Sequence, residues 1–443
     1  VYLYDELDSD PRDIVGVFDN QNECHGFANI THDVQSTETG LYLTVYDSQT
    51  SGRELKFRLW QYSTGREIVL TTTPTISFQK DAMLGTDKPV RFDGGEAFVQ
   101  NFKLQKGWNW VSFNLKSADL SDVNKLLGSM KWSDGDILTE LNSKLTMNYE
   151  AGAKQWIANG STAGMTISPQ KAYAIKVKQD CTLPISGTVV KKETDRTIGL
   201  SKGWNAIGYT PMTNLTVETA LSDYYDQAQQ GDVIKSHTEF AYFTKTGNTG
   251  HWRGSLQYMK PGEGYMMLCK ADTATFTYPY YDMSSNFRED WNTSLNRAAA
   301  APVMSRSTMS LSATVSGIEL EEGDRLVAYA NGEVVGEALV DEATVGGETA
   351  DHTEPLYLSI AGEAKEGIWF AIEREGEIVA ATDEVMTFQA NAVIGSPDEP
   401  TDISFVRAEY ADGQWYSISG MKLQKRPKQS GVYIFNGRKV VVK

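Results

Sequence analysis

The chain has 443 residues, of which 40% are hydrophobic, so it is long enough for about three domains with packed cores. Its net charge of −17 argues against a nucleic-acid partner, because phosphate binding needs a concentrated basic surface. No apolar run approaches the roughly 20 residues that a membrane-spanning helix needs, so we expect no transmembrane segment.

Residues 1–95 predict a module of short β-strands. Apolar residues, many of them β-branched or aromatic, mostly alternate with other residues in four runs bounded by turn residues. These runs are Val15–Phe18, Leu41–Tyr46, Leu55–Trp60 and Ile68–Leu70. Short strands separated by turns are typical of an immunoglobulin-like (Ig-like) β-sandwich.

An acidic stretch, Asp5–Asp13, precedes the first of these strands and resembles a calcium-binding loop at first sight. Carboxylates are ligands that Ca²⁺ prefers, so Asp8, Asp10 and Asp13 are the candidate ligands. The stretch lacks the glycine and the distal glutamate of the EF-hand pattern. We therefore predict no metal site and no cofactor. If a metal ion does bind, these three carboxylates are its candidate ligands.

A four-residue motif occurs twice in the centre of the chain. Lys106-Gly107-Trp108-Asn109 returns 96 residues later as Lys202-Gly203-Trp204-Asn205. The same spacing of 96 relates Gly135-Asp136 to Gly231-Asp232 and Trp156 to Trp252, and a spacing of 92 relates Tyr173 to Tyr265. This periodicity predicts a duplicated β-rich module that lost four residues from one loop. Each copy carries one predicted short helix, over Leu120–Leu127 with a serine cap and over Thr216–Tyr225.

The Ig-like pattern also returns, near the other end of the chain. Phe78-Gln79, Ala82 and Gly85 recur at the same internal spacing as Phe388-Gln389, Ala392 and Gly395. A strand-like segment, Met309–Val315, opens the second copy, whereas the first copy has only Val1–Tyr4 in that place. We therefore expect the first strand of the first copy to be cut short. Since the chain begins without a methionine or a signal peptide, we also expect a mature or trimmed product.

The sequence thus predicts a mostly all-β, multi-domain chain of β-sandwich (Ig-like) modules around a duplicated central β-rich module. The predicted segments are an Ig-like module (1–95), two Gly-Trp-Asn repeats (96–190 and 191–283), a linker (284–308), a second Ig-like module (309–405) and a C-terminal segment (406–443). If the duplications are real, Trp108 and Trp204 should occupy equivalent buried positions, as should Phe78 and Phe388.

The C-terminal segment is basic, in contrast to the acidic residues before it. Glu319–Asp402 holds 21 acidic and three basic residues, whereas Gly413–Lys443 holds seven basic residues and no acidic one. The segment predicts a strand, a turn and a strand over Asp412–Leu423. A strand at Gly431-Val432-Tyr433-Ile434 and a terminal strand over Val440–Lys443 follow.

These tail motifs resemble the C-terminal sorting domain of type IX secretion substrates in Bacteroidota. The resemblance covers about the last 35 residues, and the Pro-Asn-Pro run that usually opens the longer domain is missing. It implies that Gly431, Tyr433, Lys439 and Lys443 belong to a sorting motif read by the secretion machinery. It also implies an extracellular or outer-membrane location in a Gram-negative bacterium. The upstream modules are similar to accessory β-sandwich repeats of such surface proteins.

The duplication separates aromatic residues that recur from those that do not. Recurring ones, such as Trp156 with Trp252, are expected in the cores. Aromatic residues without a counterpart are free to bind a ligand, because flat rings stack on sugars. These candidate ligand-binding residues are Trp60, Trp110, Trp132, Tyr280 and Tyr281. Trp132 faces Ala228 in the second copy, within a polar stretch, so we expect its side chain to be exposed.

The sequence offers no catalytic constellation. Its five histidines fall at no metal-ligand spacing, and none stands beside a serine or cysteine nucleophile motif. We therefore predict that the chain is not an enzyme but a non-catalytic cell-surface or secreted protein for adhesion or for binding a glycan or protein ligand. The alternative is the C-terminal accessory and sorting region of a larger secreted hydrolase whose catalytic domain lies upstream.

Overall fold

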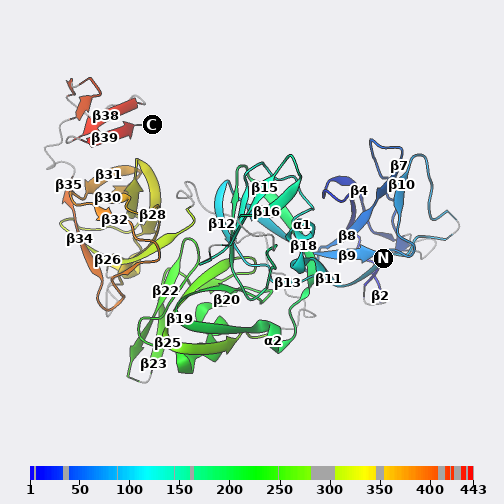
Figure 1. Cartoon of the computed structure of the whole chain (residues 1–443), viewed down its shortest axis with the longest axis horizontal. Helices are drawn as coiled ribbons and strands as arrows, with labels where there is room; N and C mark the ends of the chain where they lie inside the picture. The colour runs from blue at the N-terminus through cyan, green and yellow to red at the C-terminus, as the bar shows by residue number, and fades with distance from the viewer. Residues whose placement is uncertain are drawn as a thin grey trace. The chain divides into compact units, whose positions relative to one another are not determined.

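The computed structural model describes residues 1–3, 6–32, 39–86, 88–143, 145–159, 164–247, 249–280, 305–345, 354–407, 415–419, 421–423, 431–435 and 438–442 (Figure 1). The chain consists mainly of strands, arranged in several separate sheets, with a few short helices. This arrangement confirms the predicted mostly β, multi-module chain. Two compact units are distinguished, Val1–Gln227 with Tyr258–Arg297 and Ala228–Gln257 with Ala298–Lys443. No helix among the described residues is long and apolar enough to cross a membrane.

The first sandwich module (residues 1–95) belongs to the first unit. Its strands are β1 (Tyr2–Leu3), β2 (Glu6–Leu7), β3 (Ile14–Phe18), β4 (Cys24–Asn29), β5 (Thr31–His32), β6 (Thr39–Gly40), β7 (Ser51–Glu54), β8 (Lys56–Gln61), β9 (Arg66–Thr71) and β10 (Ser77–Gln79). The order β4-β3-β8-β9 continues through β11 (Asp93–Leu104) and β18 (Cys181–Val189) to β13 (Leu115–Lys116). One sheet therefore runs from this module into the first repeat.

The predicted strand at Leu41–Tyr46 pairs with no strand among the described residues. Its side chains alternate between half-buried and exposed, as those of a strand do, and the backbone N–H of Tyr46 donates to the carbonyl of His25 at 2.8 Å. The extended conformation was therefore predicted correctly, but the ladder is missing.

The first repeat (residues 96–190) holds a sheet of order β12-β17-β14-β15-β16. These strands are β12 (Gly107–Val111), β14 (Ile137–Glu140), β15 (Thr146–Glu150), β16 (Gln155–Ala158) and β17 (Tyr173–Val177). In place of one helix over Leu120–Leu127 there are two turns, η1 (Ala118–Ser121) and α1 (Val123–Leu126). The predicted serine cap is Ser117, whose hydroxyl accepts from the N–H of Asp119 at the start of η1. Asp122 caps α1, because its carboxylate accepts from the N–H groups of Asn124 and Lys125.

The second repeat (residues 191–283) contributes to both units. The first unit holds α2 (Glu193–Arg196), β19 (Thr197–Gly208), β20 (Leu215–Thr216), α3 (Val217–Ala220), η2 (Ser222–Gln227), β24 (Tyr258–Met259) and β25 (Gly264–Thr277). The second unit holds the meander β21 (Val233–Lys235), β22 (Phe240–Thr246) and β23 (Thr249–Gly254). Trp204 faces Leu268 across β19 and β25 as Trp108 faces Lys176 across β12 and β17. This register and that of the meander repeat the first copy and support the duplication.

The second sandwich module (residues 309–405) belongs to the second unit. Its elements are β26 (Thr308–Ser316), β27 (Arg325–Ala330), β28 (Glu333–Leu339), α4 (Glu342–Val345), β29 (Leu356–Ala361), β30 (Gly367–Arg374), β31 (Glu377–Ala381), β32 (Met386–Thr387), β33 (Val393–Ile394), β34 (Thr401–Ser404) and β35 (Val406–Arg407). The order β28-β27-β30-β31 repeats β4-β3-β8-β9, with a register shift at the same place in β27 and β3.

The C-terminal segment forms a sheet of order β37-β36-β38-β39, in which β38 and β39 lie side by side (Figure 1). Its strands are β36 (Trp415–Ser417), β37 (Lys422–Leu423), β38 (Gly431–Phe435) and β39 (Arg438–Val442). Gly431 and Tyr433 lie in β38 and Lys439 in β39, whereas Lys443 lies outside the described residues. The backbone is therefore the predicted series of strands.

The predicted burial of the recurring aromatic residues is only partly right. Phe388 is 2% exposed, but Phe78 is half-buried. Trp108 and Trp204 are also half-buried, because each lies on the face of its sheet that points away from the core of its own repeat.

Candidate functional site

The recurring Gly-Trp-Asn motif holds the backbone in place through its glycine and asparagine. Asn109 accepts from the N–H of Gln105 at 2.9 Å, and its amide donates to the carbonyls of Gln105, Gly107 and Ile175. Asn205 repeats the contacts, accepting from Ser201 N–H at 3.0 Å. The glycines have φ angles of 101° and 98°, in the region that favours glycine. The motif thus fixes the backbone at the start of β12 and at the register shift within β19.

Two other recurring residues also serve the fold. The carboxylate of Asp136 accepts from the N–H of Ser133 at 2.7 Å, and that of Asp232 accepts from Gln229 at 2.8 Å. Each closes the turn before a strand. The hydroxyl of Tyr173 likewise accepts from the N–H of Ser168 at 2.8 Å, with an equivalent bond at Tyr265. Recurrence therefore marks residues that act within one copy.

The outer sheet faces of the two repeats meet within the first unit, and their contacts are reciprocal. The N–H of Ser112 donates to the carbonyl of Gly262 at 3.0 Å, and the N–H of Gly208 donates to that of Gln170 at 2.9 Å. Ser112 corresponds to Gly208 and Gln170 to Gly262, so each copy offers the same surface to the other, as in a two-fold dimer. A Cβ on Gly208 would lie 2.0 Å from the carbonyl oxygen of Pro169, so only glycine fits there.

Trp110 is part of this contact, which corrects its prediction as a ligand-binding residue. It is 6% exposed and clusters with Ala172, Ala174 and Met266. Its counterpart in the second repeat is Ala206, whose cross-strand neighbour is Met266, whereas the neighbour of Trp110 is Ala174. A large residue beside a small one in each copy lets the two faces interlock. The tryptophan lacks a counterpart because of packing.

The prediction that Trp132 is exposed is wrong as well. It is 8% exposed, its indole N–H donates to the carbonyl of Leu127 at 2.7 Å, and its ring meets that of Trp156 edge-on at 5.0 Å. Ala228, at the equivalent position, is also buried, at 4% exposed. The polar neighbours of Ala228 were therefore a misleading sign of exposure, and Trp132 belongs to the core of the first repeat.

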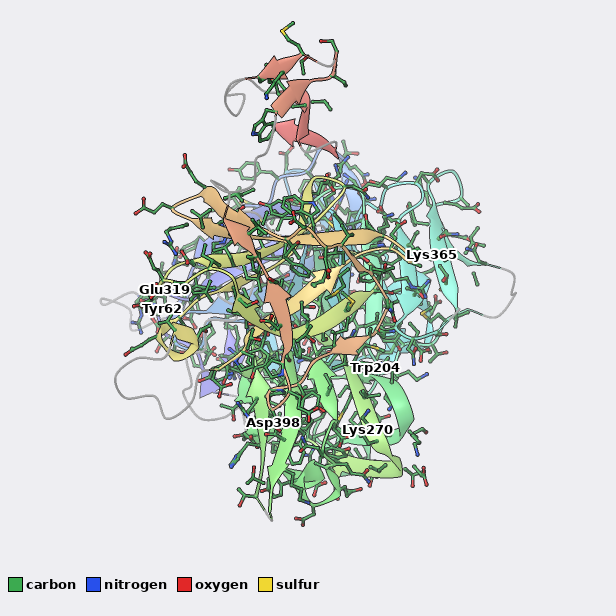
Figure 2. The ribbon with its side chains drawn as sticks, turned by 90° about the vertical axis from the view of Figure 1, so that its left-hand side faces the viewer. Tyr62, Trp204, Lys270, Glu319, Lys365 and Asp398 are labelled. Atoms are coloured by element: carbon green, nitrogen blue, oxygen red, sulfur yellow. The ribbon has the colours of Figure 1, made fainter. Side chains whose placement is uncertain are left out.

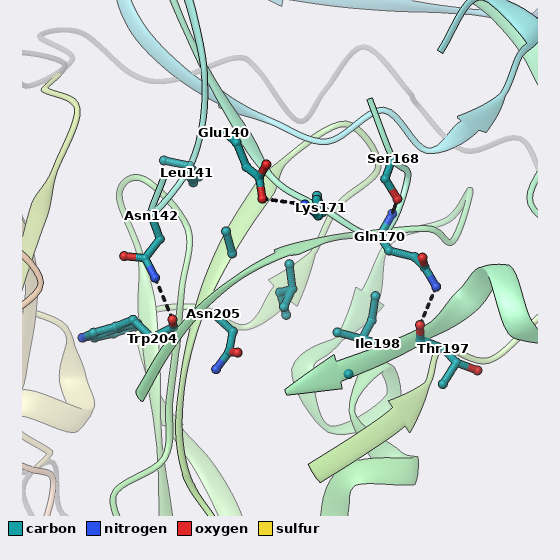
Figure 3. Close-up of a pocket in the computed structure, with 13 residues that line it drawn as sticks. Glu140, Leu141, Asn142, Ser168, Gln170, Lys171, Thr197, Ile198, Trp204 and Asn205 are labelled. Carbon is teal, nitrogen blue, oxygen red and sulfur yellow. Dashed lines mark hydrogen bonds and ion pairs between the residues drawn. The ribbon is translucent and has the colours of Figure 1, made fainter. Parts of the chain in front are cut away.

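The reciprocal contact leaves a cleft of about 390 Å³ between the two repeats (Figure 3). One wall comes from the end of β14 and the turn before β17, and the other from β19. The indole of Trp204 stands at one end of the cleft (Figure 3), and Figure 2 labels the same residue on the whole ribbon. Trp108, its counterpart, does not line the cleft. The cleft is lined by Glu140, Leu141, Asn142, Ser168, Gln170, Lys171, Thr197, Ile198, Gly199, Trp204, Asn205, Ala206 and Ile207.

Hydrogen bonds hold the polar side chains of this cleft in place. The amide of Asn142 donates to the carbonyl of Trp204 at 2.7 Å, and the amide of Gln170 donates to that of Thr197 at 2.6 Å. Lys171 and Glu140 form an ion pair at 2.8 Å. The contacts of Asn142 and Gln170 join the two walls of the cleft, whereas the ion pair of Lys171 and Glu140 lies within one wall (Figure 3). Amide, hydroxyl and indole groups together can donate to and accept from a neutral polar ligand.

Sequence reasoning missed Trp204, Asn142 and Gln170. Its recurrence predicts a core position for Trp204 instead. The available signal was Ala206, two residues further on, because a small residue on the same face leaves room beside the tryptophan. Asn142 and Gln170 carried no signal, since their partners are more than 20 residues away.

Of the remaining aromatic candidates, Trp60 and Tyr280 do not line this cleft. Trp60 is half-buried and meets the ring of Tyr62 edge-on at 5.8 Å in the first sandwich module. Tyr280 is 38% exposed, and the guanidinium of Arg196 lies 5.6 Å from its ring. Tyr281 lies outside the described residues. None of the four predicted ligand-binding residues that the structure describes lines the cleft.

The candidate calcium ligands cluster around a buried turn. Asp13 is 1% exposed and accepts from the N–H of Tyr62 at 2.8 Å. Burial, followed by the nearby carboxylates of Asp8 and Asp10, raises the pKa of Asp13 to about 7. Asp10 instead pairs with Arg12 at 2.7 Å, which lowers its pKa to about 2.

The second sandwich module has the same turn, and there an arginine side chain contacts the aspartate. Asp324 corresponds to Asp13: its carbonyl accepts from Val340 at 2.8 Å, as that of Asp13 accepts from Ile30 at 3.1 Å. Arg374 donates to both carboxylate oxygens of Asp324 at 2.8 Å. The residue at the position of Arg374 in the first module is Gln61. The shared role of this aspartate is to close a turn, so a metal is not needed to explain it.

A second carboxylate cluster lies in the first sandwich module. Asp19, Glu23 and His25 are close enough together to hold a metal ion. Arg53 forms an ion pair with Asp19, and Lys131 forms one with Glu23. Two cations therefore already neutralise the two carboxylates, and Asp19 also accepts from backbone N–H groups of its own turn. The cluster is an ion-pair network.

Comparison with protein-family models, with curated proteins and with solved structures finds no match to this chain. The geometry of the cleft is therefore the basis for the functional proposal.

Proposed function

We propose that the chain is a non-catalytic, multi-module binding protein of the cell surface, and that the cleft between the Gly-Trp-Asn repeats binds a neutral glycan. The observation that carries the proposal is the position of Trp204 at the end of a cleft lined by amide and hydroxyl groups. An indole offers an apolar face and a polar edge, which suits a sugar ring with its hydroxyl groups.

The charge of the cleft favours a neutral ligand and binding without hydrolysis. Glu140 is the one carboxylate among the residues that line it, and Lys171 neutralises that carboxylate. Glycoside hydrolysis generally needs two carboxyl groups that flank the scissile bond, so these lining residues fit recognition better than cleavage.

We propose further that the C-terminal segment addresses the chain to the outer membrane surface through the secretion machinery. Its support is the resemblance of the tail, with Gly431, Tyr433 and Lys439 on paired strands. Deleting 412–443 should leave the protein inside the cell envelope of its host. Unchanged surface labelling of the truncated protein would contradict this part of the proposal.

The duplication supplies a matched control for the glycan site. Trp204→Ala should abolish the signal on a glycan array, and Trp108→Ala should leave it unchanged, because Trp108 lies at the same place in its motif but does not line the cleft. Circular dichroism of both variants checks that they fold. Equal loss of signal in the two variants, or retention in both, would overturn the proposed site.

A further inference from the structure

A buried lysine joins the meander of the second repeat to the second sandwich module, and both parts lie in the second unit. Lys235, the last residue of β21, is 0% exposed. Its side-chain nitrogen donates to the carbonyl of Thr308 at 2.9 Å and to the side-chain oxygen Oδ1 of Asn391 at 3.0 Å. Thr308 opens β26, and Asn391 lies in the turn before β33. A primary amine is therefore held against a carboxamide, away from water.

One backbone carbonyl holds both groups. The carbonyl of Thr308, which accepts from the lysine, also accepts from the backbone N–H of Asn391 at 2.9 Å. A turn bond from the N–H of Ala392 to the carbonyl of Gln389, at 3.0 Å, fixes the backbone on either side of Asn391, whose φ is 61°. Asparagine adopts this left-handed conformation more readily than most residues. The fold itself therefore sets the positions of the amine and the carboxamide.

Burial makes the amine of Lys235 a nucleophile. Removal from water disfavours the charged form and lowers the pKa of Lys235 from 10.5 to about 7. A substantial fraction of this side chain is then neutral at physiological pH, and the neutral amine is the form that attacks a carbonyl carbon. An exposed lysine, with its ordinary pKa, is almost entirely protonated at the same pH.

Neither group recurs in the other copy of its module. The position of Lys235 is held in the first repeat by Thr139, whose hydroxyl donates to the carbonyl of Leu145 at 2.9 Å within that repeat. The position of Asn391 is held in the first sandwich module by Asp81, which is exposed and has a φ of 60°. The turn therefore forms without a lysine beside it. An amine and a carboxamide occur at these positions only in the two copies that meet.

We propose that Lys235 and Asn391 form an isopeptide bond, which joins the second repeat covalently to the second sandwich module. Rotation about the Cε–Nζ bond turns the lone pair of the neutral amine toward Cγ of Asn391. The Nζ–Cγ bond forms, and the bond from Cγ to the amide nitrogen breaks. One proton of the attacking nitrogen passes to the leaving nitrogen, which departs as ammonia. An amine and a carboxamide thus give a secondary amide and ammonia, without an oxidant, a reductant or a second substrate.

The positions of the two groups favour a reaction that is slow in water. Well-oriented groups within one molecule react as if at concentrations of about 10⁵–10⁸ M, because the entropy of bringing them together has already been lost on folding. Burial also keeps water from competing for the carbonyl carbon. A single turnover is sufficient, since the product remains part of the chain and the ammonia is lost to solvent.

The bond ties together positions 156 residues apart in the sequence. A force applied to the chain outside this loop passes through the bond, and the strands from β26 to β31 within the loop do not bear it. Such a tie suits a protein that carries load at a cell surface. The inference does not rest on the proposed glycan site, because none of its residues lines the cleft.

Mass spectrometry of the intact full chain tests the bond directly. The folded chain is incubated at pH 8, where the amine of Lys235 is mostly neutral, and its mass is then measured under denaturing conditions. The chain should be lighter than its sequence by one molecule of ammonia. Proteolytic digestion and tandem mass spectrometry should identify a branched peptide in which the side chains of Lys235 and Asn391 are joined.

Two variants locate the reaction, and a third serves as a control. Lys235→Met, which replaces the amine by an apolar side chain of similar length, and Asn391→Ala should each keep the full mass of their sequences. Asn331→Ala should still lose ammonia, because Asn331 is another turn asparagine of the same module, with a φ of 50°, whose amide donates to Glu366. Circular dichroism checks that the three variants fold.

The result for the unmodified chain decides the proposal even if a variant fails to fold. Its full sequence mass, with Lys235 and Asn391 recovered in separate peptides, would overturn the proposal. Loss of ammonia without the branched peptide would also overturn it, because an asparagine that cyclises onto its own backbone loses ammonia too. Loss of ammonia that persists in folded Lys235→Met would likewise contradict the assignment of the nucleophile.

Discussion

The two sandwich modules share the order of four strands, a register shift, a buried turn aspartate and a close contact between a glycine, Gly26 or Gly336, and the carbonyl of a facing segment. Among the described residues, however, only the second module has a full-length strand at the position of β26. β26 pairs with β29 in the second module, whereas the segment 41–47, the counterpart of β29 in the first module, pairs with no described strand, and its apolar side chains are half-buried. The path of the chain in such a module is therefore fixed by a few local contacts. Closure of the core is a separate matter that depends on one long-range pairing.

The largest expected effect is on unfolding free energy, and it compares the equivalent residues Phe388 and Phe78 of the two sandwich modules. Phe388→Ala should cost about 3–5 kcal/mol of unfolding free energy, because Phe388 is 2% exposed and the change leaves a cavity. Phe78→Ala should cost about half as much, since its ring is already partly hydrated. Denaturant unfolding with hydrogen exchange on each module measures both, and equal costs would mean that the first core is closed after all.

The next effect separates the two turn aspartates. Asp324→Asn removes charge-assisted hydrogen bonds from Arg374 and should destabilise the second module by about 1.5–3 kcal/mol at pH 8. Asp13→Asn keeps an acceptor for the N–H of Tyr62 and removes repulsion from Asp8 and Asp10, so it should stabilise the first module at that pH. Thermal melts of the two variants should shift in opposite directions, and a shift in the same direction would refute the comparison.

The pH dependence of the two turns should also have opposite signs. The pKa of Asp13 is raised from 3.8 to about 7, so the folded state binds more protons than the unfolded state between about pH 4 and 7. Its contribution to stability therefore falls as pH rises through that window. Arg374 helps lower the pKa of Asp324, whose contribution is present above the unfolded value and is lost as pH falls through the folded one. Asp13→Asn should flatten the decline between pH 4 and 7; an unchanged slope would contradict the assignment.

The smallest effect concerns the outer sides of the two equivalent segments. Tyr357 of β29 packs edge-on against Phe240 at 5.7 Å, and its hydroxyl donates to Glu354 at 3.0 Å. Tyr357→Ala should cost about 1–2 kcal/mol from the lost ring contact and burial. Tyr42→Ala, at 95% exposure, should stay within about ±0.5 kcal/mol. A cost above 1 kcal/mol at Tyr42 would show that something covers this side of the first module.

The sequence predicted the parts of this fold that are set locally. The recurring Gly107 and Asn109 act through residues two to four positions away, and the alternation at 41–46 gave the correct extended backbone. What failed depended on distant contacts. Trp110 packs on Met266 of the other repeat, and only the fold brings those two together. The ligand-binding prediction for Trp110 and Trp132 rests on their lack of a counterpart. That lack can mean either a ligand or an asymmetric packing contact, and sequence does not separate the two.

The central claim is that no described strand of the first module pairs with the segment 41–47 as β26 pairs with β29 in the second module. Native-state hydrogen exchange of residues 41–47 and of Leu356–Ala361 (β29) in the unmodified chain tests it most directly. Amides of an unpaired edge open at little free-energy cost, whereas those of a core strand approach the cost of global unfolding. We predict that 41–47 exchanges at least about a hundredfold faster than β29 on average. Equal protection of the two segments would contradict the account.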